Sequence, residues 1–149
     1  MFPGSIGWRA QLAIGDQIVT QSILLCDDEI HILRAAEFKL KRAGYDVRIA
    51  GDGQEGWELI EQRKPDMIIT DCQMPRLDGL GLVKRVRANP DTQDIPCLML
   101  TAKGFELSEE ELAEQWQVKR LIAKPFSPRE LLAIVQEILG EPVAASDAL

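Results

Sequence analysis

The sequence predicts an α/β protein with a doubly wound, five-stranded parallel sheet. Short apolar runs alternate with helical segments five times between residues 23 and 140. The apolar runs have the form of strands buried on both faces, which is typical of parallel sheets. The total of 149 residues, 46% hydrophobic and 28% charged, is that of an ordinary globular domain. Repeated strand-to-helix units imply right-handed crossovers, with helices covering both faces of the sheet.

The first predicted unit runs from a buried strand into an amphipathic helix. The apolar run Ile23–Cys26 stops abruptly at the acidic stretch Asp27–Glu29. From Glu29 to Ala43, apolar residues recur at spacings of three and four with basic residues between them, which predicts a helix. Gly44 supplies the stop signal after that helix.

The second and third units repeat this order. Tyr45–Ala50 is predicted as a strand, and a Gly-Asp-Gly turn then leads into a helix that ends before Pro65. Met67–Thr70 is a further apolar run, and it ends on the acidic residue Asp71. After a turn rich in Pro, Asp and Gly, the residues from Leu80 to about Ala88 predict the next helix.

The last two units contain the most clearly marked helix. Cys97–Thr101 and Leu121–Lys124 are predicted strands, separated by an acidic helical stretch from Ser108 to Trp116. The motif Ser127-Pro128-Arg129-Glu130 has the form of a capping box with Pro at the first helical position. It therefore predicts the start of a final helix, which ends near Gly140.

The repeat divides the chain into a main domain and two flanking segments. Residues 23–140 form the predicted domain, and residues 141–149 are expected to be a short tail with no room for a further output domain. Residues 1–22 are an N-terminal extension of unknown role. An extra strand, a docking arm and an unstructured leader all stay open for it.

Charge and composition exclude several classes of function. The 17 Lys and Arg residues against 24 Asp and Glu give a net charge of −7, which argues against nucleic acid or an anionic membrane as the main partner. No apolar run approaches the ~20 residues that a membrane-spanning helix needs, and no signal peptide is evident. The three cysteines lie in apolar segments and indicate buried thiols in a reducing compartment, so a cytoplasmic location is expected.

Polar residues end four of the five predicted strands, and together they suggest a site. These residues are Asp27 with Asp28, Asp71, Thr101 and Lys124. In an open parallel sheet such strand ends converge on one rim, where ligands bind. Three carboxylates crowded there would resist ionisation unless a cation neutralised them, and Mg²⁺ fits best.

This constellation indicates phosphoryl chemistry. A carboxylate beside Mg²⁺ can attack phosphorus and form an aspartyl phosphate. Lys124 would then balance the charge of the transferred oxygens, and Thr101 could donate a hydrogen bond to one of them. Any one of these acidic residues alone would more simply be a solvated loop residue or a helix cap.

Four motifs resemble the receiver domain of two-component response regulators: Ile23-Leu24-Leu25-Cys26-Asp27-Asp28-Glu29, the stretch Asp71–Gly79, Leu100-Thr101-Ala102 and Ala123-Lys124-Pro125-Phe126. The resemblance implies a flavodoxin-like fold with strand order 2-1-3-4-5 and phosphorylation at Asp71 by a sensor histidine kinase or a histidine phosphotransfer protein. It also implies that Asp28 and Asp71 ligate Mg²⁺ directly, Asp27 through water and Cys72 through its backbone carbonyl. Thr101 and Lys124 would contact the bound phosphoryl group.

One position departs from the family pattern. Many receivers carry Tyr or Phe three residues before the lysine, and this chain has Leu121 there. The preceding stretch, Gln117-Val118-Lys119-Arg120, places two cations near the usual output face. Because Leu cannot swing as an aromatic ring does, we predict an altered output surface.

Three functions from different classes follow from these residues. The first is a stand-alone receiver, or a phosphate shuttle in a relay, that signals to a downstream protein target, has no independent substrate turnover and could form a homodimer. The second is an aspartate-nucleophile phosphatase, but such an enzyme typically needs an acid two residues after the nucleophile, where this chain has Gln73. The third is a scaffold that is not phosphorylated, which loss of an acid, the hydroxyl or the lysine would signal; all are present.

Overall fold

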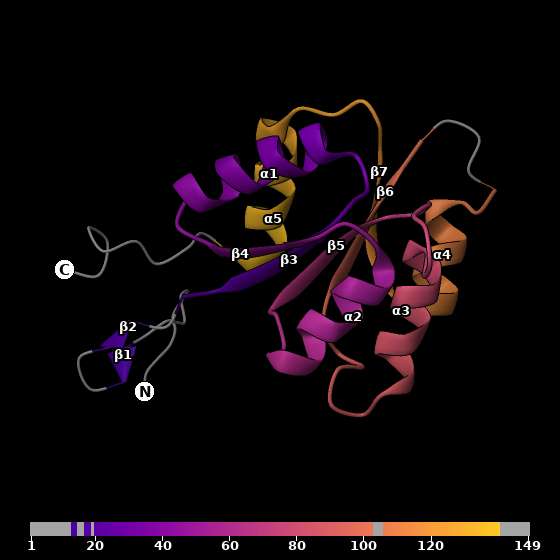
Figure 1. Ribbon diagram of the computed structural model, residues 1–149, viewed down its shortest axis with the longest axis horizontal. Helices are drawn as coiled ribbons and strands as arrows, with labels where there is room; N and C mark the ends of the chain where they lie inside the picture. Colours follow the sequence, from indigo (N-terminus) through magenta and orange to yellow (C-terminus); the bar gives the residue numbers. More distant parts are fainter. Residues whose placement is uncertain (1–12, 15–16, 19, 103–105, 141–149) are drawn as a thin grey trace.

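The computed structural model describes residues 13–14, 17–18, 20–102 and 106–140. Its element order alternates strand and helix from residue 22 onward, as the sequence predicts (Figure 1). The elements in chain order are β1 (Ala13–Ile14), β2 (Gln17–Ile18), β3 (Ser22–Cys26), α1 (Ile30–Arg42), β4 (Asp46–Ala50), α2 (Gly53–Gln62), β5 (Met67–Asp71), α3 (Gly79–Ala88), β6 (Cys97–Thr101), α4 (Glu109–Trp116), β7 (Val118–Ala123) and α5 (Pro128–Leu139).

The central sheet confirms the predicted topology. Its five strands lie in the order β4-β3-β5-β6-β7, which is 2-1-3-4-5 when these strands alone are numbered along the chain. All four pairings are parallel. The chain places β4 on one side of β3 and β5 on the other, so the strand order reverses at β3. In a doubly wound sheet, ligands bind beyond the carboxyl ends of the two strands at such a reversal, which are β3 and β5 here.

Two hydrophobic cores hold the helices against the sheet. Helices α1 and α5 cover one face, and α2, α3 and α4 cover the other (Figure 1). The fully buried strand β5 supplies both cores, because alternate side chains point to opposite faces: Met67 and Ile69 toward α1 and α5, Ile68 toward the other layer. The sheet therefore holds the ends of its strands in fixed positions.

Helix ends follow the signals in the sequence. Ser127 accepts a hydrogen bond from the Glu130 amide at 3.1 Å, and Glu130 accepts one from the Ser127 amide at 2.7 Å, which confirms the predicted capping box. Helix α1 ends at the predicted place, before Gly44 with its positive φ of 111°. A second capping box, formed by Ser108 and Glu111, begins α4 and was not predicted.

The last strand begins earlier than predicted. We expected it to start at Leu121, but β7 starts at Val118, which pairs with Cys97. Gln117 has a left-handed backbone (φ 53°) that ends α4 abruptly and turns the chain straight into the strand. The polar Lys119 and Arg120 interrupt the apolar pattern that would indicate a strand. Polar residues are tolerated there because β7 lies at the edge of the sheet and is only partly buried.

Part of the N-terminal extension is also described. β1 and β2 form a two-residue antiparallel pair, in which Ala13 faces Ile18. The rest of residues 1–19 and the predicted tail, residues 141–149, lie outside the described residues. Among the helices that are described, none has the length and apolar character needed to cross a membrane.

Candidate functional site

The carboxyl ends of four strands bring the predicted site residues to one rim. Asp71 and Thr101 are the last residues of β5 and β6, Asp27 follows β3 directly, and Lys124 follows β7. One carboxylate oxygen each from Asp27, Asp28 and Asp71 lies within 4.8 Å of the other two. Asp27 and Asp71 are buried, whereas Asp28 is exposed. The predicted convergence of these three acids is therefore observed.

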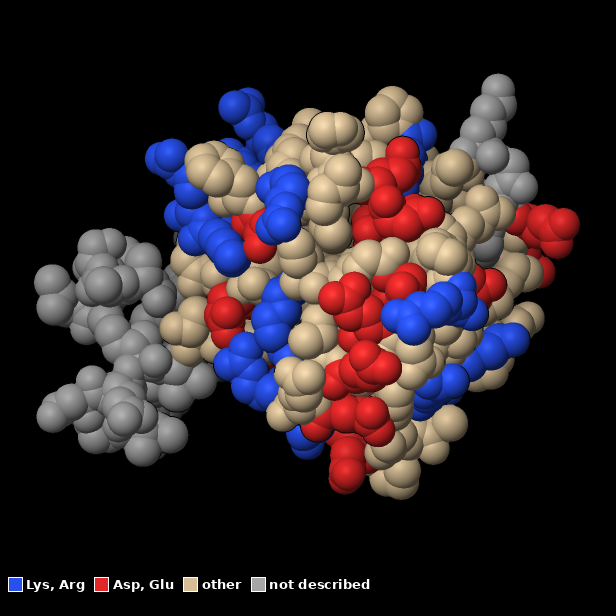
Figure 2. Space-filling model, in the orientation of Figure 1, with Lys and Arg blue, Asp and Glu red and all other residues tan. Residues whose placement is uncertain are grey.

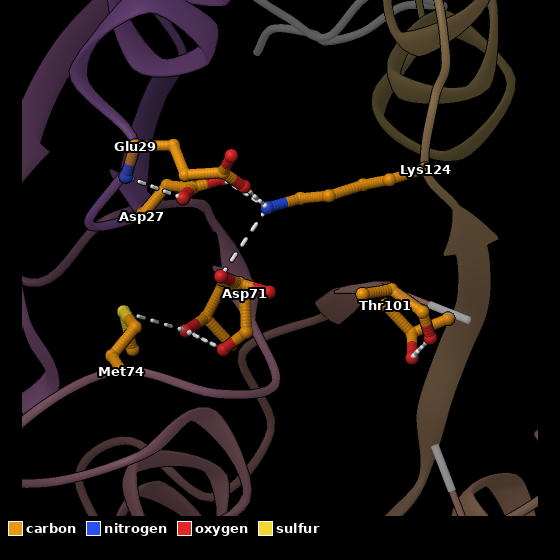
Figure 3. A network of polar contacts seen from close by, with 8 residues as sticks. Asp27, Glu29, Asp71, Met74, Thr101 and Lys124 are labelled. Atoms are coloured by element: carbon orange, nitrogen blue, oxygen red, sulfur yellow. Dashed lines mark hydrogen bonds and ion pairs between the residues drawn. The ribbon is translucent and has the colours of Figure 1, made fainter. Parts of the chain in front are cut away.

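Lys124 reaches across the rim to the buried acids. Its Nζ lies 3.0 Å from Asp27 Oδ2 and 3.3 Å from Asp71 Oδ2 (Figure 3). The shortest contact, 2.6 Å, is to Oε1 of Glu29, which the sequence analysis gave no role. Although burial disfavours the charged ammonium, its hydrogen bond to Glu29, its close contact with Asp27 and the negative charges of the acids raise the pKa of Lys124 above its ordinary value. Lys124 is therefore a permanent cation in this site.

The donor set fits a hard divalent cation. Asp27 Oδ1 accepts a hydrogen bond from the Glu29 amide at 2.9 Å. Asp27 Oδ2 is buried and has no hydrogen-bond partner; it faces Lys124 only as an ion pair. A buried carboxylate oxygen without a donor is costly unless a charge compensates it. The three carboxylates, of which Asp27 carries this buried oxygen, match the all-oxygen coordination that Mg²⁺ prefers.

The surroundings of Asp71 raise its pKa. Burial, and then the negative charge of Asp27, raise the pKa of Asp71 above its ordinary value. Lys124 and the backbone amide of Gln73 act in the opposite direction, but less strongly. An added positive charge would lower this pKa and stabilise the ionised carboxylate that a nucleophile needs.

Thr101 occupies the predicted strand end but makes a different contact. Its hydroxyl donates to the carbonyl oxygen of Ala102 at 2.9 Å rather than to a carboxylate (Figure 3). Burial raises the pKa of the Cys72 thiol to about 12, and the Thr101 hydroxyl acts on this pKa in the opposite direction. In the structure, Thr101 is therefore beside the acids without being bonded to them, and its role toward a phosphoryl group stays a prediction.

The main-chain ligand also stays a prediction. The carbonyl oxygen of Cys72 accepts a hydrogen bond from the Gly79 amide at 3.0 Å, where α3 begins. The next amide, that of Gln73, bonds to the Asp71 carboxylate, so the Gln73 backbone also borders the site. Gln73 is thus a second backbone position of this loop that borders the site.

A close packing contact shapes this loop from behind. A Cβ atom on Gly79 would lie 1.9 Å from the carbonyl oxygen of Asp71, so only glycine fits where α3 begins. On the outer side of the loop, Arg76 has a positive φ of 66° and binds both carboxylate oxygens of Asp52 at 3.0 and 3.1 Å. These contacts fix the segment that follows Asp71.

Leu121 stands where many receivers have an aromatic residue, and both its side chain and its amide make contacts. Its side chain is half-buried against the core on the α2 to α4 side, and its amide donates to Glu109 of α4 at 2.9 Å. Of the two cations upstream, Lys119 is exposed and Arg120 pairs with Glu137 of α5. The predicted effect on the output surface stays a prediction.

The sheet order and the carboxylate cluster together define an α/β signalling domain of the receiver class. A model of the response regulator receiver domain matches residues 23–136, and the chain belongs to this family. The predicted resemblance and the predicted flavodoxin-like fold are thereby confirmed.

Particular relatives agree with this assignment. The alkaline phosphatase synthesis transcriptional regulatory protein PhoP of Bacillus subtilis is 40% identical over 121 residues, which cover 81% of this chain and 49% of PhoP. Among solved structures, the chemotaxis response regulator CheY4 of Vibrio cholerae has a TM-score of 0.73 and 30% identity, over 80% of this chain and 99% of that one. The receiver domain of the sensor histidine kinase PA1611 of Pseudomonas aeruginosa, with a magnesium ion in its active-site cleft, has a TM-score of 0.71 and 31% identity, over 82% and 99%. The chain spans about half the length of the curated relatives it matches.

Proposed function

We propose that this receiver accepts a phosphoryl group on Asp71 in a Mg²⁺-dependent reaction and signals through a change in its protein contacts. The observation that carries the proposal is the position of Lys124 Nζ, 3.0 Å from Asp27 and 3.3 Å from Asp71 in a cluster of three carboxylates. A lysine that was only structural would need no cluster of three carboxylates beside it, two of them buried.

The chain's own residues supply most of what the transfer requires. An Asp71 carboxylate oxygen attacks phosphorus, and the bond from phosphorus to the leaving oxygen of a donor such as acetyl phosphate breaks. Acetate leaves with the bonding electron pair, and no proton has to move. Lys124 balances the charge of the phosphoryl oxygens, and Thr101 can donate to one of them once its hydroxyl turns from Ala102. A bound Mg²⁺, held by Asp28 and Asp71 with Asp27 through water, would neutralise charge on donor and acceptor.

The physiological donor in this proposal is a sensor histidine kinase or a histidine phosphotransfer protein, and the output is a downstream protein target. The relatives PhoP and PhoB are transcriptional regulators about twice as long as the matched region. A stand-alone receiver in the cytoplasm that does not bind nucleic acid, with residues 1–22 as an extension and 141–149 as a tail, stays our prediction. So does the possible homodimer.

The two alternatives predict different products in one experiment. The protein is incubated with Mg²⁺ and acetyl phosphate, and its intact mass is followed together with that of Asp71→Asn. We expect the wild type to gain the mass of one phosphoryl group, the variant to gain none, and EDTA to abolish the gain. Steady turnover of phosphate monoesters would favour the phosphatase, and no gain in the wild type would favour the scaffold.

A further inference from the structure

Glu29 makes the shortest contact of the lysine in the site. Its Oε1 lies 2.6 Å from Lys124 Nζ, compared with 3.3 Å for Asp71 Oδ2. The Glu29 side chain is 58% exposed, whereas those of Asp71 and Lys124 are 8% and 11% exposed. The ammonium thus contacts the exposed Glu29 carboxylate, at the solvent-exposed mouth of the site, together with the two buried acids (Figure 3).

The position of Glu29 in the fold makes this contact notable. Glu29 is the N-cap residue of α1, a position at which Ser, Thr, Asp or Asn commonly accept a hydrogen bond from an amide of the first helical turn. Its side chain makes no such bond and extends to Lys124 instead, while its own amide donates to Asp27. The contact therefore ties the start of α1 to the end of β7.

We propose that Glu29 is a positioning residue that holds Lys124 toward the mouth of the site and thereby slows phosphorylation of Asp71. This inference rests on the proposed function. A phosphoryl group on Asp71 brings new anionic oxygens that Lys124 must contact, so the contact with Glu29 belongs to the resting state and weakens on the way to the transition state. An interaction that is stronger in the ground state than in the transition state lowers the rate.

The expected size of the effect follows from the exposure of Glu29. An ion pair with one largely exposed partner is weak. Removing it should speed phosphorylation about two- to five-fold, the rate equivalent of such a pair. The inner acids would still hold the Lys124 ammonium in the site, at 3.0 and 3.3 Å.

Two substitutions separate the contact from the charge. Glu29→Gln keeps the length of the side chain and removes its charge, whereas Glu29→Asp keeps the charge and shortens the reach to Lys124. Glu61→Gln is the matched control, since it removes one exposed carboxylate from α2, away from the rim. The rate of mass gain is measured for each protein with Mg²⁺ and acetyl phosphate. Without Mg²⁺, the exchange of the Lys124 ammonium protons is followed by NMR.

We expect both Glu29 variants to be phosphorylated about two- to five-fold faster than the wild type, with Glu61→Gln unchanged. The Lys124 ammonium protons should exchange faster in both Glu29 variants. Acceleration in Glu29→Gln alone would overturn the proposal in favour of simple repulsion between Glu29 and the anionic donor. Equal rates and equal exchange in all four proteins would also overturn it. A wild type that gains no phosphoryl mass would instead refute the proposed function, and the exchange data would still show whether Glu29 holds Lys124.

Discussion

Replacing Lys124 with Met tests whether charge neutralisation organises the rim. Met keeps most of the aliphatic stem but removes the ammonium that lies 3.0 Å from Asp27 and 3.3 Å from Asp71. With an effective dielectric constant of ~20, each of these attractions is about 5 kcal/mol. Much of that is offset by the cost of desolvating the ammonium, and breaking a buried ion pair typically costs about 3–5 kcal/mol.

We expect Lys124→Met to lose about 3 kcal/mol of unfolding free energy at neutral pH, the lower end of that range, because the rim is open to solvent on the side of Glu29. For a domain of this size, the melting temperature should fall by about 10 °C. Thermal unfolding followed by circular dichroism measures both quantities. Lys119→Met is the matched control, since Lys119 is exposed on the same strand and should change stability by less than about 0.5 kcal/mol.

The pH dependence separates charge from packing. Without Lys124, the pKa of Asp71, already raised by burial and by Asp27, rises further. A carboxyl group whose pKa is raised by folding stabilises the protein below its unfolded pKa, and this stabilisation is lost as the pH rises through the folded pKa. The deficit of Lys124→Met should therefore be largest at neutral pH and shrink toward about pH 4. An equal deficit at both pH values would refute the electrostatic reasoning and indicate lost packing of the lysine stem.

Three further perturbations probe the same rim. Asp71→Asn should raise the melting temperature at neutral pH without divalent cations, since it removes an ionised carboxylate whose pKa folding raises; a lower melting temperature would contradict this. Mg²⁺ at 100 times its dissociation constant should stabilise the wild type by about 2.7 kcal/mol. At the same Mg²⁺ concentration, the same unfolding assay should show a smaller stabilisation of Asp28→Asn. Gly79→Ala should cost about 3 kcal/mol, because its Cβ would lie 1.9 Å from a backbone oxygen. Gly51→Ala serves as the control, since its Cβ would lie 3.7 Å from the Glu55 carboxylate, an ordinary contact.

The fold was predictable because its signals are local. The capping motif at Ser127, the stop at Gly44 and the fully apolar strand β5 each depend on a few neighbouring residues. The predicted start of β7 was wrong because the strand lies at the sheet edge, where polar side chains are tolerated and interrupt the apolar pattern. The left-handed backbone at Gln117 could not be predicted either, because many residue types occur at helix ends and Gln gives no distinctive signal there.

The sequence by itself determined which residues end the strands, and parallel pairing then required Asp27, Asp71, Thr101 and Lys124 to meet at one rim. Only the tertiary structure decided how the side chains there share their contacts. Lys124 lies closer to Glu29 than to Asp71, although 95 residues separate it from Glu29. Such a preference depends on distances of a few tenths of an ångström between separate segments, which packing sets and no local pattern records.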